Sequence, residues 1–308
     1  MNISNVPDQP TTSSKSLKQI MRKHPLLFYF LLAYAISWIV FTPYVLAEWG
    51  ILQGNYTLFY ILHTFGPALS AIIMTAVVAG KSGLQDLRRR IWQWRAPWGW
   101  YLFILLGIPA LILLGILLQP GGLAGFHDLS PIILVSYPFA FILTFFGGGP
   151  LGEEIGWRGF ALPRMQKQLG PLWGTLLLGL LWTGWHLSDF LTMSKGGGQG
   201  TGWTTFLTNF PVFMLAVVSL AVIFTWIYNH TRGSIFIAIL AHTSVNILEV
   251  LLIPRYLTLD EISLHRALLT GVGVLALLLL ILTRGRLGYQ FGQEQSVGPE
   301  KVEAHTTT

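Results

Sequence analysis

Eight long apolar stretches constrain this chain more than any other feature of its sequence. A helix needs roughly 20 apolar residues to cross the hydrocarbon core of a bilayer. The stretches that approach or reach this length are 26–47, 56–79, 99–118, 131–149, 172–191, 211–229, 233–252 and 265–283. We therefore predict an all-α, polytopic membrane protein with about eight transmembrane helices.

The composition agrees with a membrane protein and excludes several kinds of site. Of the 308 residues, 53% are hydrophobic and only 10% are charged, whereas about 25% of a soluble domain is charged. The chain has no cysteine, which excludes disulfides, thiolate metal sites and a cysteine nucleophile. Its formal charge is +6. We interpret this charge as basic residues that flank membrane helices, and we expect no nucleic-acid partner.

The distribution of basic residues predicts the orientation of the chain. With eight spans, all 19 Lys and Arg except Lys195, Arg255 and Arg266 fall in segments on the same side. Lys and Arg are enriched on the cytoplasmic side of membrane proteins. We therefore predict a protein of the cell membrane with both termini in the cytoplasm.

The sequence indicates one transmembrane domain, residues 21–286, between two polar ends. Residues 1–20 and 287–308 are poor in apolar residues, so we predict that both ends are disordered and cytoplasmic. Within the domain, the segment 80–98 combines helical spacing of apolar residues with arginines and tryptophans. This pattern predicts a short helix on the membrane surface.

The first cluster of polar residues follows three glycines and Pro150. Ionisable groups within apolar segments are energetically costly and by default indicate function. Glu154 and Arg158 are four residues apart, so they can pair on one face of a helix. Glu153 points about 100° away and is left for a different role. An ion pair at the start of a helix explains these residue types equally well.

Two further clusters lie in later apolar stretches. His186 stands near two tryptophans, and a hydrogen-bonded packing histidine is the more frequent explanation for such a residue. His242 and Asn246 are four residues apart and share one face of the seventh predicted span. For this pair a functional role is favoured over polar packing, because lipid does not solvate such side chains.

An acid, two imidazoles and an amide on three helices are suited to hydrolysis. A glutamate can take a proton from water with the help of a histidine, and an amide and an imidazole can donate hydrogen bonds to an oxyanion. The sequence has no Gly-x-Ser-x-Gly motif and no His-Glu-x-x-His motif. A zinc site built from Glu153, His186 and His242 is the open alternative.

With these residues, the chain resembles the CAAX-processing and bacteriocin-processing intramembrane endopeptidases, the type II CAAX prenyl endopeptidase family. The motifs occur in the family's order, and the resembling core covers residues 145–250. The three motifs are Glu153-Glu154-x-x-x-Arg158, the run from Leu181 to His186, and His242-x-x-x-Asn246.

The resemblance implies an eight-helix fold and a metal-free peptidase without a cofactor, whose site opens toward the cytoplasmic leaflet. Its partners would be membrane lipid and a peptide or lipidated-protein substrate; it implies no oligomeric state. The roles it implies are Glu153 as general base, His186 as its partner, His242 and Asn246 as oxyanion donors, and Glu154 and Arg158 as organising residues.

Two other functions and one difficulty of depth stay open at this point. The same fold can serve as a non-catalytic immunity or scaffold protein, and a transporter would need inverted repeats, which the sequence lacks. The predicted spans place Glu153 near the cytoplasmic end of its helix. His186 lies roughly 21 Å into its span and His242 roughly 14 Å, at 1.5 Å per residue. The three can meet only if the Glu153 helix reaches deeper than hydropathy indicates.

Overall fold

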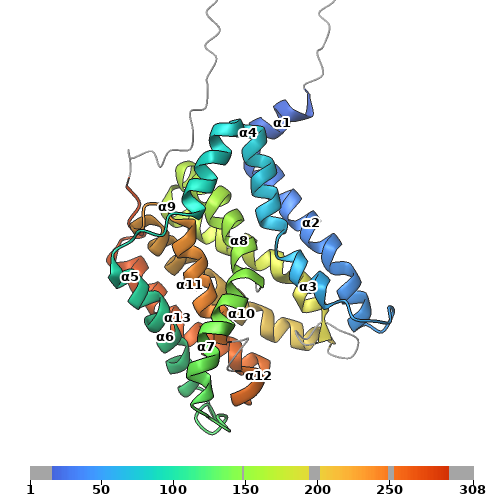
Figure 1. Ribbon diagram of the computed structural model, residues 1–308, viewed down its shortest axis with the longest axis vertical. Helices are drawn as coiled ribbons and strands as arrows, with labels where there is room; N and C mark the ends of the chain where they lie inside the picture. The colour runs from blue at the N-terminus through green and yellow to red at the C-terminus, as the bar shows by residue number, and fades with distance from the viewer. Residues whose placement is uncertain (1–15, 148, 194–201, 249–252, 291–308) are drawn as a thin grey trace, which may run out of the picture.

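The computed structural model describes residues 16–147, 149–193, 202–248 and 253–290. Within these ranges the chain is helical, without a β-strand, apart from one isolated bridge between Phe126 and Leu257. Figure 1 shows the helices bundled around α8 and α11. The predicted all-α membrane fold is confirmed.

The first half of the chain forms α1 (Leu17–Lys23), α2 (Pro25–Glu48), α3 (Thr57–His63), α4 (Gly66–Ile91), α5 (Trp98–Leu102), the π-helix η1 (Phe103–Gly107), α6 (Ile108–Leu117) and α7 (Ile132–Gly147). The second half forms α8 (Pro150–Gly156), the π-helix η2 (Trp157–Ala161), α9 (Leu162–Trp185), the 3-10 helix η3 (His186–Leu191), α10 (Gly202–His230), α11 (Ile235–Ile247), α12 (Ile253–Tyr256) and α13 (Glu261–Leu282).

Each of the eight predicted spans overlaps a helix, but the count of eight is not confirmed. Among the described residues, five helical segments are long and apolar enough to cross a membrane, and a sixth results if α7 and the bent segment that follows it count as one span. The seventh predicted span contains α11, whose 13 residues are short for a crossing. Its short length is balanced by burial, since most of its side chains face other helices.

Local features explain where several of these helices begin. The side chain of Asp260 accepts a hydrogen bond from the amide of Ser263 at 3.0 Å and caps α13. Ser234 caps α11 through the amide of Ile237 at 3.1 Å. Pro150 occupies the first turn of α8, where its missing amide proton leaves no hydrogen bond unmade. The sequence therefore sets the start of both helices that carry the acidic and the third polar motifs.

Three details differ from the sequence-based expectations. The predicted surface helix is the second half of α4, which bends at Gly80 and ends at Ile91. The N-terminal prediction of disorder lies mostly outside the described residues, but residues 17–20 are helical, because Ser16 and Gln19 form a capping box. The tail prediction also lies mostly outside them, although Leu287 is fully buried and its carbonyl accepts from Asn229.

A helical hairpin turning at Gly170 solves the difficulty of depth. Gly170 has φ 77° and ψ 165°, a conformation open almost only to glycine. The two arms pack closely, since a Cβ on Gly174 would lie 2.8 Å from the backbone of Met165. At 1.5 Å per residue, Glu153 and His186 lie at nearly equal distances from the turn, both roughly 25 Å. The two residues therefore reach the same depth.

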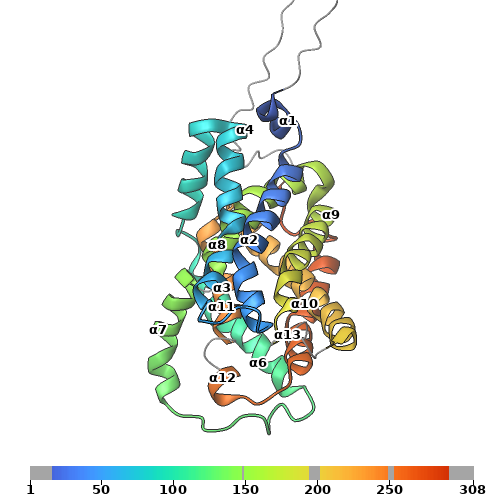
Figure 2. The ribbon, with the colours of Figure 1, turned by 90° about the vertical axis from the view of Figure 1, so that its right-hand side faces the viewer.

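This hairpin corrects the prediction that the segment after Pro150 is a cytoplasmic loop. The segment 150–166 is helical and largely buried, and Arg158 is fully buried instead of facing the cytoplasm. Figure 2 shows α8, α3 and α11 at mid-height, between α1 and the bend of α4 at one end and α12 at the other. The first and third polar motifs are thus placed together within the bundle.

Candidate active site

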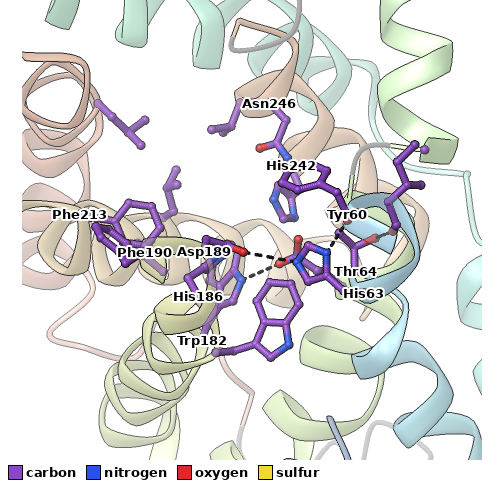
Figure 3. Close-up of a pocket in the computed structure, with 18 residues that line it drawn as sticks. Tyr60, His63, Thr64, Trp182, His186, Asp189, Phe190, Phe213, His242 and Asn246 are labelled. Atoms are coloured by element: carbon purple, nitrogen blue, oxygen red, sulfur yellow. Dashed lines mark hydrogen bonds and ion pairs between the residues drawn. The ribbon is translucent and has the colours of Figure 1, made fainter. Parts of the chain in front are cut away.

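The four residues predicted to carry the chemistry line one cavity. Glu153, His186, His242 and Asn246 all contribute to its wall, and its volume is about 170 Å³. Figure 3 shows His242 and Asn246 entering from α11, His186 and Trp182 from the end of α9, and residues of α3 from the opposite side. The cavity is large enough for several waters, so it meets the geometric requirement for a hydrolytic site.

Glu153 is held by two indole groups. Trp182 donates to Glu153 Oε2 at 2.7 Å, and Trp157 donates to the same oxygen at 3.3 Å. Gly149 precedes α8 with φ 97°, and a Cβ there would lie 2.7 Å from Glu153 Oε1. A side chain at position 149 would therefore collide with the carboxylate. Glu153 is only 3% exposed, and the two indole groups fix the orientation of its carboxylate.

Glu154 lies behind the cavity wall and joins two helices. Its Oε1 accepts from Arg158 Nη1 at 2.8 Å, as the spacing of the two residues predicts. The same oxygen accepts from His242 Nδ1 at 2.9 Å. The faces of Trp182 and Phe224 lie 4.6 and 5.0 Å from the guanidinium carbon, a favourable cation–π geometry. Glu154 therefore orients the His242 ring, and Arg158 neutralises the buried carboxylate.

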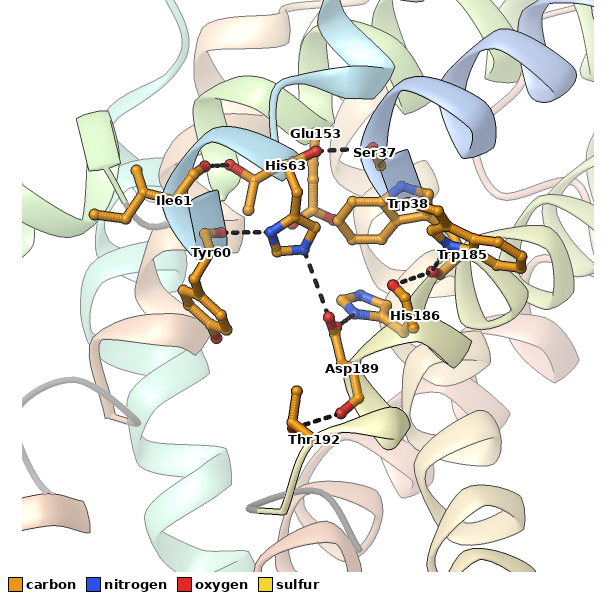
Figure 4. Close-up of polar contacts among 12 residues, drawn as sticks. Ser37, Trp38, Tyr60, Ile61, His63, Glu153, Trp185, His186, Asp189 and Thr192 are labelled. Carbon is orange, nitrogen blue, oxygen red and sulfur yellow. Dashed lines mark hydrogen bonds and ion pairs between the residues drawn. The ribbon is translucent and has the colours of Figure 1, made fainter. Parts of the chain in front are cut away.

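His186 belongs to a chain of polar side chains that the sequence analysis did not identify. Its Nδ1 lies 2.7 Å from Asp189 Oδ2, and His63 Nε2 lies 3.5 Å from Asp189 Oδ1. His63 Nδ1 in turn contacts the carbonyl oxygen of Tyr60 (Figure 4). Asp189 follows His186 by three residues, a spacing that aligns side chains on a 3-10 helix. That spacing was the available signal, whereas nothing local points to His63.

The rest of the cavity wall is apolar. It faces the polar groups from η3, α10, α11 and α13, and Phe213 also packs edge-on against the His186 ring at 5.3 Å. The cavity can therefore hold an apolar group beside the polar side chains. Its apolar members are Phe190, Phe213, Val217, Leu220, Val245 and Leu268.

The alternative of a zinc site was tested against the positions of these side chains. Zinc in a hydrolytic site needs three protein ligands around one point. Among the residues that the structure describes, no three His, Cys, Asp or Glu side chains are arranged to hold one metal ion. Glu153, His186 and His242 share the cavity but do not form such a group, so no reaction step through zinc is derived.

Comparison with known proteins agrees with the motifs. Residues 135–248 match the family described as type II CAAX prenyl endopeptidase Rce1-like. This segment is similar to that family. The chain is also 26% identical, over 233 residues, to a protein of Methanococcus maripaludis named CAAX prenyl protease 2, and the alignment covers 73% of this chain and 83% of the relative. The resemblance predicted from the three motifs is confirmed.

The matched segment, residues 135–248, holds the predicted site residues but does not complete the cavity. All six predicted residues lie between positions 153 and 246, within the matched segment. His63, Tyr60 and Thr64 line the same cavity from α3, which precedes that segment. The site is therefore built by the matched segment together with the N-terminal helices.

Proposed function

We propose that this membrane protein is an intramembrane endopeptidase that hydrolyses a peptide bond with water activated by Glu153 and His186. The observation that carries the proposal is the meeting of Glu153, His186, His242 and Asn246 in one cavity. The family that residues 135–248 match supports endopeptidase activity within the membrane. A prenylated protein or peptide is the proposed substrate, because the matched family and the relative are named for such substrates.

In the proposed reaction, Glu153 accepts a proton from water while the water oxygen attacks the peptide carbonyl. The proton then passes to the leaving amine, and His186 helps to hold and transfer it. Asn246 and His242 would donate hydrogen bonds to the oxygen that becomes negatively charged. Because His242 Nδ1 donates to Glu154, donation to the substrate needs a second proton on Nε2. Because Arg158 already neutralises Glu154, the resulting charge would be offset by the negative charge that develops on the substrate oxygen.

The reaction is proposed to need no metal ion, and the arrangement of donors supports this. No metal-ligating group of three is present in the described part of the chain. A chelator is expected to leave turnover unchanged in the purified protein. Stoichiometric zinc whose removal stops turnover, and whose return restores it, would contradict this part of the proposal.

The test uses purified protein in liposomes and a fluorogenic peptide that ends in a farnesylated CAAX sequence. Glu153→Ala, His186→Ala and His242→Ala should each lower kcat by at least about 100-fold, the usual contribution of a proton-transfer group. Insertion and thermal stability should remain close to wild type. Glu48→Ala is the matched control, because Glu48 lies at the end of α2 and does not line the cavity.

Each outcome bears on a different part of the proposal. Normal cleavage by Glu153→Ala would remove the proposed base. Cleavage of an unprenylated peptide alone would replace the substrate class and keep the peptidase. The wild-type protein could cleave neither the prenylated nor the unprenylated peptide, while the three variants still support the same cellular phenotype as wild type. That outcome would favour a non-catalytic membrane protein of the same fold.

A further inference from the structure

The polar chain from Tyr60 through His63 and Asp189 to His186 is not explained by the proposed reaction alone. The carboxyl side chain of Asp189 is only 14% exposed. Burying a carboxylate costs free energy of desolvation, which only well-placed ion-pair and hydrogen-bond partners can offset. Both partners are histidines, and both line the cavity beside Glu153. The arrangement therefore calls for a role in setting the state of His186.

We infer that Asp189, held by His63, is a positioning residue that sets the tautomer and orientation of His186. This inference rests on the proposed function for its effect on rate. Asp189 also lines the cavity, but in this role it acts through the imidazole and not on the reacting atoms.

Hydrogen-bond direction gives the chemical reason. An ionised carboxylate can only accept, so His186 Nδ1 must carry the proton in its 2.7 Å contact with Asp189. In the neutral ring, Nε2 then has a free lone pair. That nitrogen can accept a proton and return it to the leaving amine. The opposite tautomer would present an N–H at Nε2 and could not accept the proton.

His63 is rigidly placed to hold the other carboxylate oxygen. Its ring is stacked between Phe41 at 4.3 Å and Trp185 at 5.3 Å. The carbonyl of Tyr60 can only accept, so His63 Nδ1 carries a proton, and donation from Nε2 to Asp189 needs a second proton on the ring, as in an ion pair. The stack and the two polar contacts leave the ring no freedom to turn. His63 Nε2 therefore lies beside the second carboxylate oxygen of Asp189 at ion-pair distance.

The backbone on both sides of this chain is also fastened. Thr192 donates to the carbonyl of Asp189 at 2.7 Å, and Ser37 donates to the carbonyl of His63 at 2.8 Å (Figure 4). Trp38 donates to the carbonyl of Trp185 at 2.9 Å, directly before His186. Helices α2 and α3, outside the matched segment, thus hold the histidine that this segment supplies.

The first measurement needs no substrate. In protein labelled with ¹⁵N-histidine, the His186 signals are identified by their loss in His186→Ala. The wild-type ring should carry its proton on Nδ1, and Asp189→Asn should shift the population toward the Nε2–H form. A wild-type His186 that is protonated on Nε2 alone would overturn the inference, whether or not the protein is a peptidase.

The second measurement is the effect on turnover. Asp189→Asn should lower kcat by about 10- to 100-fold, the equivalent of one charge-assisted hydrogen bond, while KM stays within about twofold. Asp86→Asn is the control, because Asp86 is equally buried at 14% and pairs with arginines of α4. A changed KM with unchanged kcat would place Asp189 in substrate binding and overturn the inference.

The third measurement tests His63 through Asp189. His63→Phe keeps the aromatic stack and removes the donor, so kcat should fall, whereas His63→Gln keeps a donor and should retain more of the rate. In the Asp189→Asn background, His63→Phe should cause no further loss, since both act through one hydrogen bond chain. Multiplying losses would show that His63 acts elsewhere. Full turnover in all these variants, with cleavage still dependent on Glu153, would refute the positioning and leave the peptidase intact.

Discussion

Replacing Arg158 by methionine gives the most direct measure of the buried charge network. Arg158 and Glu154 are both fully buried and 2.8 Å apart. Arg158→Met keeps an unbranched side chain among the aromatic rings but leaves the Glu154 carboxylate without its cation. Removing one partner of a buried ion pair destabilises a protein by about 3–5 kcal/mol. At about 2–4 °C per kcal/mol, the midpoint of unfolding should fall by roughly 6–20 °C.

The double variant Glu154→Met/Arg158→Met separates stability from activity. Exchanging a buried ion pair for apolar side chains is often neutral or stabilising, so most of the lost midpoint should return. Activity should not return, because His242 Nδ1 then lacks the acceptor that orients its ring.

The assay is thermal unfolding in detergent, followed by intrinsic fluorescence, together with cleavage of the farnesylated peptide. Arg89→Met is the control, because Arg89 is 65% exposed in its pair with Asp86, and an exposed pair contributes about 0–1 kcal/mol. An Arg158→Met protein that unfolds within about 2 °C of wild type would refute the reasoning. So would a double variant that is no more stable than the single one.

Three further predictions follow from the fold. Gly170→Ala forces a Cβ into a backbone conformation reserved for glycine and should cost about 1–3 kcal/mol, seen as a lower unfolding midpoint and a lower kcat. Gly271→Leu places a Cβ 2.3 Å from the carbonyl of Leu111 on α6 and should destabilise the protein by at least about 1–3 kcal/mol, whereas Gly99→Ala, with open space around it, should leave the midpoint near wild type. Asp260→Ala removes the cap of α13 and should cost about 1 kcal/mol at neutral pH. Hydrogen bonds from Ser263 hold the pKa of Asp260 below its usual range, so this stabilisation is present above the carboxyl's unfolded pKa and is lost as pH falls through its folded pKa. A midpoint difference between wild type and Asp260→Ala that persists unchanged in strong acid would contradict that assignment.

Much of the fold could be predicted from the sequence, because the length of an apolar stretch and the spacing of residues along a helix are local properties. The pairing of Glu154 with Arg158 was predicted from their separation of four residues. The same separation placed His242 and Asn246 on one helix face, and both line the cavity. The depth of Glu153 within the bundle could not be predicted from the sequence. Arg158, Arg164 and Lys167 make the segment after Pro150 look water-exposed, but tertiary pairing buries the first of these side chains completely.

The partners of His186 show a second limit. Asp189 stands three residues away in the sequence, so its contact with His186 could have been predicted from helical spacing alone. His63 lies in an apolar helix far earlier in the chain and meets Asp189 only through the packing of α2, α3 and η3. Contacts of this kind depend on how separate helices pack, and no single sequence pattern encodes them.

The equal arms of the hairpin at Gly170 determine where this chain can accept changes of length. One residue added within either arm would rotate everything beyond it by about 100° and advance it by about 1.5 Å. That screw motion would carry Glu153 away from the indole of Trp182, or His186 away from the cavity. Residues added at the turn itself leave both arms in register. A reporter peptide or a whole folded domain is therefore best grafted at position 170, where the graft would lie roughly 25 Å along either arm from Glu153 and His186.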